Sequence, residues 1–164
     1  MSHFEKVKKL PIYQKAELLH QLVESLAASL PDEDEYIQVA KDLMRSDAMM
    51  IPAKIAGAEG GDLYSIRMQK AALIREHAIQ LDIQISDLRF QKNYTNIEYV
   101  LLIRKELNEF RLLFIDWINS FDATNYVWDD WELFNPNGAI RPTDNNTHFE
   151  DDEFNSDDFW DNND

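Results

Sequence analysis

The residue pair with the clearest chemical potential is Glu17 and His20, which have Glu-x-x-His spacing. A helix places residues three apart on one face, and di-metal carboxylate bundles combine two such pairs with two further inward carboxylates. A second pair is missing, because His77 follows Glu76 directly and has Ile74 three positions before it. The ligand set is incomplete, so we expect no metal ion here and interpret His20 as a surface or interface residue.

Other catalytic sets are missing from the sequence as well. The chain has no cysteine, which excludes disulfides, thiolate metal sites and cysteine nucleophiles. It contains no phosphate loop, nucleophile elbow or dinucleotide fingerprint. The acidic run at residues 32–35 could bind a cation, but Asp32 and Glu35 have capping-box spacing and a helix N-terminus favours carboxylates. We therefore predict a protein that is not an enzyme and has no cofactor.

Basic side chains occur in short groups on two stretches with helical periodicity. Arg67 and Lys70 lie three apart, and Arg104 and Arg111 lie two helical turns apart. One interpretation is a nucleic-acid-binding track formed by these four residues. The other is ordinary solvated helix faces that pair with glutamates.

Charge is distributed unevenly along the chain. The formal net charge is −15, and nine of the 31 acidic residues lie in residues 143–164, which contain no Lys or Arg. Residues 1–142 therefore carry 22 acidic against 16 basic residues, a net charge of −6. An acidic body counts against binding driven mainly by phosphate contacts.

The hydrophobic pattern predicts an all-α, up-down-up-down four-helix bundle over residues 1–121. Pro11 suits a first helical turn, Pro31 ends that helix, and the sequence Thr95-Asn96-Ile97-Glu98 predicts a capping box before the fourth helix. Apolar residues recur at three- and four-residue steps in four segments, as bundle helices require. The four stripes are Leu19, Leu22, Val23, Leu26 and Leu30; Ile37, Ala40, Met44, Ala48, Ile51 and Ile55; Ile74, Ala78, Leu81, Ile85 and Leu88; and Val100, Ile103, Leu107, Phe110, Phe114, Trp117 and Phe121.

Residues 51–62 are expected to form the elbow between the second and third helices. Pro52 removes a backbone donor and tends to kink a helix. Gly60 and Gly61 could adopt the positive φ angles of a tight helix end, and Asp62 suits the N-cap of the next helix.

The fourth helix carries more apolar surface than one stripe needs. Only Asp116 is polar between positions 112 and 118. Four short helices rarely cover such a segment on all sides, so we predict a homo-oligomer interface formed by Leu112, Ile115 and Ile118.

Two further segments follow the helices. Residues 122–142 are rich in aromatics, and we interpret them as a flap packed on the bundle, with a ligand platform as the alternative. Trp128 and Trp131 have the spacing to dock from one helical turn, and Pro136-Asn137-Gly138 predicts a turn. Residues 143–164 form an acidic tail with interspersed aromatics, which could be a partner motif, an internal competitor for a basic surface or a solubilising end.

Two motifs resemble a known family. Leu-Pro-Ile-Tyr-Gln-Lys-Ala at residues 10–16, and Ile-Pro-Ala-Lys-Ile-Ala at residues 51–56 followed by Glu59 and Gly60, are similar to the four-helix-bundle proteins encoded in ribosomal-RNA intervening sequences. Relative to the family signature Ile-Pro-Ala-Asn-Ile-Ala-Glu-Gly, Lys54 replaces asparagine and two residues are inserted before Glu59. The resemblance covers residues 10–121.

This resemblance implies an up-down-up-down bundle that assembles as a ring-like homopentamer. The same fold group includes the accessory variability determinant proteins of diversity-generating retroelements, which bind nucleic acid and a reverse transcriptase through basic surfaces. Our leading expectation is a non-enzymatic oligomeric scaffold or adaptor, with a nucleic-acid-binding accessory protein of a retroelement or reverse transcriptase system as the alternative. No apolar run reaches membrane-spanning length and no signal core is evident, so we expect a cytoplasmic protein without a membrane partner.

Overall fold

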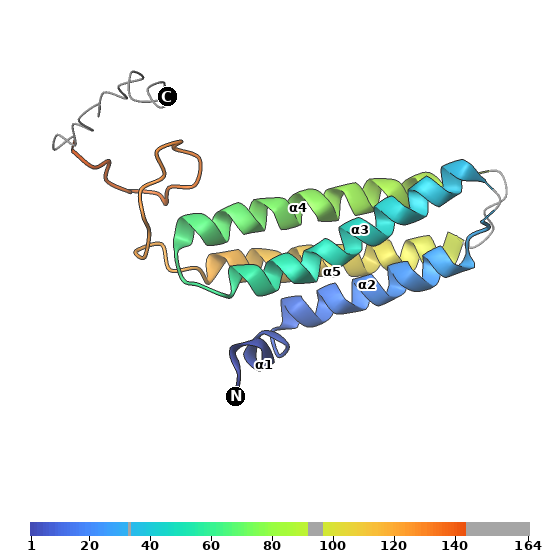
Figure 1. Cartoon of the computed structure of the whole chain (residues 1–164), viewed down its shortest axis with the longest axis horizontal. Coiled ribbons are helices and arrows are strands. Elements are labelled where there is room, and N and C mark those ends of the chain that lie inside the picture. Colours follow the sequence, from blue (N-terminus) through green and yellow to red (C-terminus); the bar gives the residue numbers. More distant parts are fainter. Residues whose placement is uncertain (33, 92–96, 144–164) are drawn as a thin grey trace, which may run out of the picture.

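The computed structural model describes residues 1–32, 34–91 and 97–143, and within them the chain is all-helical. A short helix α1 (His3–Val7) precedes the long helices α2 (Pro11–Ser29), α3 (Glu35–Ala58), α4 (Tyr64–Asp87) and α5 (Ile97–Asn119), and a 3₁₀ turn η1 (Leu88–Phe90) follows α4. The four long helices lie side by side (Figure 1). α2 and α4 each contact both α3 and α5. The all-α prediction is confirmed for the described residues, among which no helix is long and apolar enough to cross a membrane.

The predicted apolar stripes form one core shared by these helices. Leu19 and Val23 of α2, Ile51 of α3, Leu81 of α4 and Ile103 of α5 are completely buried. Ala40, Ala78, Leu22 and Phe114 are the stripe members that retain partial exposure. On α5, an aromatic ladder of Phe110, Phe114, Trp117 and Phe121 runs along the core, with neighbouring ring centroids 4.8 to 6.3 Å apart.

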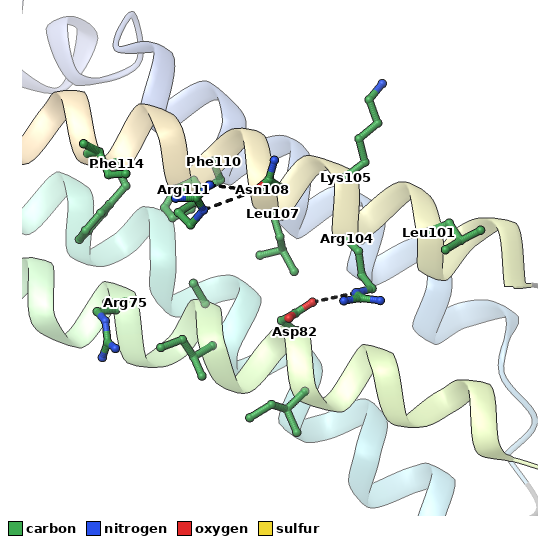
Figure 2. A pocket seen from close by; sticks show the side chains of 14 residues that line it. Arg75, Asp82, Leu101, Arg104, Lys105, Leu107, Asn108, Phe110, Arg111 and Phe114 are labelled. Atoms are coloured by element: carbon green, nitrogen blue, oxygen red, sulfur yellow. Dashed lines mark hydrogen bonds and ion pairs between the residues drawn. The ribbon is translucent and has the colours of Figure 1, made fainter.

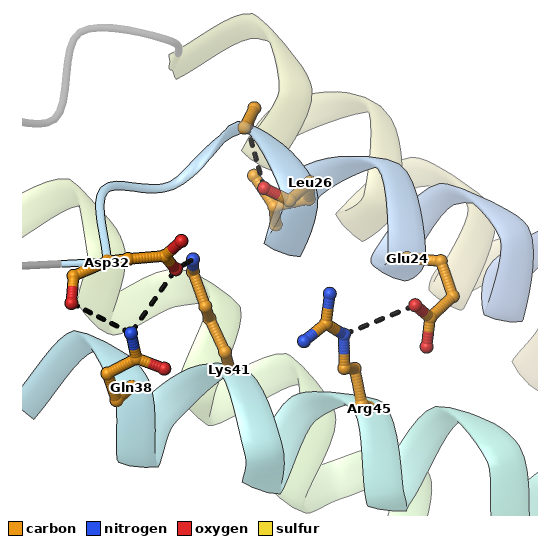
Figure 3. Close-up of polar contacts among 7 residues, drawn as sticks. Glu24, Leu26, Asp32, Gln38, Lys41 and Arg45 are labelled. Carbon is orange, nitrogen blue, oxygen red and sulfur yellow. Dashed lines mark hydrogen bonds and ion pairs between the residues drawn. The ribbon is translucent and has the colours of Figure 1, made fainter.

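The helix N-termini differ from their predicted caps. Asp34, not Asp32, caps α3, because its side chain accepts a hydrogen bond from the Tyr36 amide. Asp32 instead accepts from the buried Lys41 ammonium at 2.5 Å and from Gln38 (Figure 3). The ammonium of Lys41 lowers the pKa of the Asp32 carboxyl. A lysine that is buried needs a charged partner, and Asp32 provides it.

α4 also lacks the predicted cap. Its N-cap is Leu63, with no side-chain hydrogen bond, and the helix begins at Tyr64. The Tyr64 amide donates instead to the backbone carbonyl of Asn125, while the Asn125 side chain donates to the Asp62 carbonyl. The carbonyl of Asn125, in a later segment of the chain, therefore accepts the hydrogen bond of a helix N-terminal amide that we expected Asp62 to cap. The capping box predicted at Thr95 lies outside the described residues.

The elbow between α3 and α4 is built differently from the prediction. α3 continues through Pro52, which is buried. Neither Gly60 nor Gly61 has a positive φ, so the predicted backbone conformation is wrong. A side chain at Gly60 would be crowded, because its Cβ would lie 3.2 Å from the Gly57 carbonyl oxygen, to which the Gly60 amide donates. Glu59 has a right-handed backbone conformation where α3 ends, and the close contact between Gly57 and Gly60 follows it.

Residues 122–143 form turns without any helix. The predicted turn is confirmed, with Gly138 at φ +80° and the Ala139 amide donating to the Pro136 carbonyl. The predicted shared helical turn of Trp128 and Trp131 is wrong, since Trp128 is partly buried whereas Trp131 is 92% exposed. A local hydrogen-bonded loop, described below, replaces helical hydrogen bonding in this segment.

Candidate binding groove between α4 and α5

A groove with a volume of about 890 Å³ lies between α4 and α5 (Figure 2). Its volume falls within the range typical of ligand sites. Apolar residues make most of its floor and walls, namely Ala78, Ile79 and Ile83 of α4 with Leu101, Leu107, Phe110, Phe114 and Ile115 of α5.

Four basic residues and one acidic residue share this lining, namely Arg75, Arg104, Lys105 and Arg111 with Asp82. Arg104 donates to Asp82 across the groove at 3.2 Å, and Arg111 donates to Asn108 on its own helix (Figure 2). The groove is therefore locally basic, although the whole chain carries a net charge of −15. A field of one sign over apolar walls favours a partner with acidic and apolar groups.

The predicted interface residues lie on or beside this groove. Ile115 lines it and is 39% exposed, while Leu112 is 51% exposed. Ile118 is partly buried and packs against the core. Leu101, 53% exposed, extends the outward apolar strip of α5 that Leu112 and Ile115 form. Within one chain, the segment from 112 to 118 is thus less covered than its composition suggested.

The residues predicted to bind nucleic acid do not lie together in the structure. Arg104 and Arg111 line the groove. The Arg67 side chain is only 12% exposed, pairs with Glu59 and stacks on the Phe121 ring at 4.0 Å. Lys70 lies elsewhere on α4, where its side chain passes beside Gly57. Arg67 therefore serves the junction of three helices, and the four residues do not form one surface.

Arg75 and Lys105 belong to the groove but were absent from the predicted track. Arg75, Ile79 and Ile83 share one face of α4 at four-residue steps, and Leu101, Lys105, Asn108, Leu112 and Ile115 share one face of α5. These mixed basic and apolar faces are readable in the sequence. What the sequence does not show is that the two faces adjoin.

His20 and His77 each lie near one carboxylate. The His20 ring nitrogen lies 3.7 Å from the carboxylate of Glu24. Glu17 instead interacts with Tyr13, whose pKa is raised by burial and by that carboxylate. The His77 ring nitrogen is 2.8 Å from Asp47, which also accepts from Gln84. Among the described residues, no three His, Asp or Glu side chains gather closely enough to hold a metal ion.

A second feature lies at the start of α4, where a loop of residues 129–135 projects from the helices. A pocket of about 500 Å³ separates this loop from Ile66 and Gln69. The Asp129 carboxylate accepts hydrogen bonds from the amides of Trp131, Leu133 and Phe134 at 2.9 to 3.0 Å. These hydrogen bonds, led by that of Phe134, lower the pKa of Asp129.

Asn135 closes the same loop from its other end. Its side chain accepts from the Asp129 amide at 2.8 Å and donates to the Asp129 carbonyl at 3.1 Å. The loop therefore has its own hydrogen-bonded frame and presents Trp131 and Leu133 outward. The aromatic residues of this segment are evident in the sequence, but the exposure of Trp131 results from the conformation of the loop.

Comparisons of this chain with protein-family models, curated proteins and solved structures found no match.

Proposed function

We propose that this chain is a non-enzymatic scaffold or adaptor, an up-down-up-down four-helix bundle with a C-terminal extension that assembles as a homo-oligomer in the cytoplasm. The observation that carries the proposal is the face formed by α4 and α5, where exposed Leu101, Leu112 and Ile115 border the apolar groove. Contiguous exposed apolar surface of this kind is typical of interaction sites.

The packing of the long helices supports the bundle arrangement. Each long helix contacts two others, and only residues 59–63 separate α3 from α4. Short connections between contacting helices are typical of neighbours that run in opposite directions. The ring-like homopentamer remains the assembly that the family resemblance implies.

Mass in solution tests the assembly. Light scattering or sedimentation velocity of the full chain at micromolar concentration is expected to give a mass above the 19.3 kDa monomer. The double variant Leu112→Glu, Ile115→Glu is expected to weaken association at least tenfold, because two charges would be buried without partners. A strict monomer would overturn the proposal.

A matched control uses exposed apolar residues of another helix. Val39 and Leu43 of α3 are 53% and 50% exposed, so Val39→Glu, Leu43→Glu introduces the same charge at comparable exposure. The control is expected to keep the wild-type mass. If it dissociates the oligomer while the α5 variant does not, the interface has been assigned to the wrong helix.

The alternative function, a nucleic-acid-binding accessory protein that works with a reverse transcriptase, is favoured by Arg75, Arg104, Lys105 and Arg111 along one groove. It predicts binding of RNA or DNA at low salt that falls steeply with ionic strength and weakens in Arg75→Ala, Arg111→Ala. Neutralising Arg67 is expected to destabilise the fold instead, given its contacts with Glu59 and Phe121. No binding at low salt, by the full chain or a variant with the acidic residues of 144–164 neutralised, would exclude it.

A further inference from the structure

The loop of residues 129–135 exposes apolar side chains that nothing in the described chain covers. Trp131 is 92% and Leu133 72% exposed, and nearby Val127 and Ile140 are 62% and 81% exposed. Leaving a tryptophan in water is unfavourable, since burial of a large apolar side chain is stabilising. Hot spots of protein interfaces are enriched in tryptophan.

This loop is held in place before any partner binds. The Asp129 carboxylate and the Asn135 amide tie its backbone together, and the Ser65 hydroxyl donates to the Val127 carbonyl at 2.9 Å. A loop that is already ordered loses less conformational entropy on docking than a flexible one does. The hydrogen bonds within the loop therefore hold Trp131 in its exposed position.

Charge makes the loop complementary to the groove between α4 and α5. Asp130 and Glu132 flank Trp131 at the exposed tip, with Arg141 4.0 Å from Glu132. The groove offers apolar walls with four basic residues and one acidic residue. An acidic tip with an apolar centre therefore matches a basic rim with an apolar floor.

The loop and the groove of one chain lie too far apart for contact. Ser65 anchors the loop at the first turn of α4, whereas the α4 wall of the groove runs from Arg75 to Ile83. At 1.5 Å per residue these positions are about 15 to 27 Å farther along the helix. This offset along α4 separates the two surfaces within one chain, so we expect contact between them to occur between copies.

We propose that the loop of residues 129–135 inserts Trp131 into the α4–α5 groove of a second copy of this chain. Such a contact joins two different surfaces, so it is head-to-tail, and it forms a ring when the rotation between copies closes. The inference rests on the proposed homo-oligomeric function and specifies which two surfaces make the interface.

Cysteine crosslinking tests this pairing directly, because the natural chain contains no cysteine. Full-length chains carrying Leu133→Cys are mixed with chains carrying Ile83→Cys and treated with a short thiol crosslinker. We expect several-fold more crosslinked heterodimer than in a control mixture with Val39→Cys, an exposed α3 position. Equal yields would overturn the proposal. So would efficient crosslinking within single chains of a variant that carries both Ile83→Cys and Leu133→Cys.

Association constants provide a second measurement. Trp131→Ala is expected to weaken self-association at least tenfold without changing helicity, since the side chain supports no described core contact. Tyr36→Ala, which removes a 56% exposed aromatic from α3, is the matched control and should have no effect. If Trp131→Ala lowers stability instead, the tryptophan closes onto its own α4 pocket and the inference fails.

The two proposals fail in distinguishable ways. An oligomer that is unaffected by Trp131→Ala contradicts this inference but leaves the scaffold function intact. A monomeric wild-type chain contradicts both.

Discussion

The indole N–H of Trp117 in α5 donates a 2.7 Å hydrogen bond to Glu59, the C-cap residue of α3. The same carboxylate oxygen accepts from the guanidinium of Arg67 in α4, which stacks over Phe121. One carboxylate therefore links three helices at the end of the molecule where the C-terminal segment leaves them. None of these residues is a neighbour of another in the sequence.

We predict that Trp117→Phe lowers the free energy of unfolding by about 1–2 kcal/mol, because it removes a hydrogen bond to a charged group and keeps most of the aromatic packing. Urea unfolding followed by circular dichroism measures this change. Trp131→Phe, at a 92% exposed position, is the control and should shift unfolding by less than about 0.5 kcal/mol. Equal effects of the two variants would show that the hydrogen bond to Glu59 contributes little.

The ion pair between Lys15 of α2 and Glu106 of α5 is expected to contribute more than a surface pair. Its nitrogen and oxygen are 2.6 Å apart, with side chains 20% and 12% exposed, and the hydrogen bond that Lys15 donates to Glu106 raises the pKa of Lys15. A double-mutant cycle with alanine at both positions should give a coupling energy near 1 kcal/mol.

The control for that cycle joins α3 to α2. Arg45 and Glu24 are 3.2 Å apart, but their side chains are 39% and 46% exposed (Figure 3). Solvent screens such a pair, so its coupling should stay below about 0.5 kcal/mol. A coupling energy between Lys15 and Glu106 no larger than this would mean that their ion pair contributes little to the packing of α2 against α5.

The loop that presents Trp131 should depend on pH through Asp129. Its pKa in the folded chain is lowered by backbone hydrogen bonds, chiefly from Phe134, so the loop is stabilised above the ordinary carboxyl pKa of about 3.9. That stabilisation is lost as pH falls through the lowered pKa. The amide resonances of Leu133 and Phe134 in an NMR titration should therefore move with a midpoint below about 3.9.

Asp129→Asn supplies the comparison for this titration. Its amide keeps the shape of the side chain but replaces one acceptor oxygen with a donor, so at neutral pH the Leu133 and Phe134 amides should already have shifted toward free-loop positions. Unchanged resonances in the variant would mean that other contacts order the loop.

Much of the helical architecture was predictable, because amphipathic periodicity reports directly which face of a helix is buried. Leu19, Ile51, Leu81 and Ile103 were assigned to the core from their spacing, and all are completely buried. Helix ends were predicted less well. Asp32 and Asp62 have good capping side chains, but Lys41 binds the first and residues of the C-terminal segment satisfy the backbone near the second.

The candidate site shows the same division. Local composition indicated surplus apolar residues at Leu112 and Ile115 and basic residues at Arg104 and Arg111. Only packing showed that Arg67 faces inward, because its partners Glu59 and Phe121 are far from it in the sequence.

By itself, the sequence determined which segments are helices and which face of each is buried, since a 3.6-residue period acts within a single element. Tertiary structure alone decided that the outer faces of α4 and α5 form one groove and that Trp131 stands at the tip of a closed loop. The groove depends on packing between helices that are distant along the chain, and the loop depends on side-chain hydrogen bonds within residues 129–135. Neither feature has a periodic signal in the sequence.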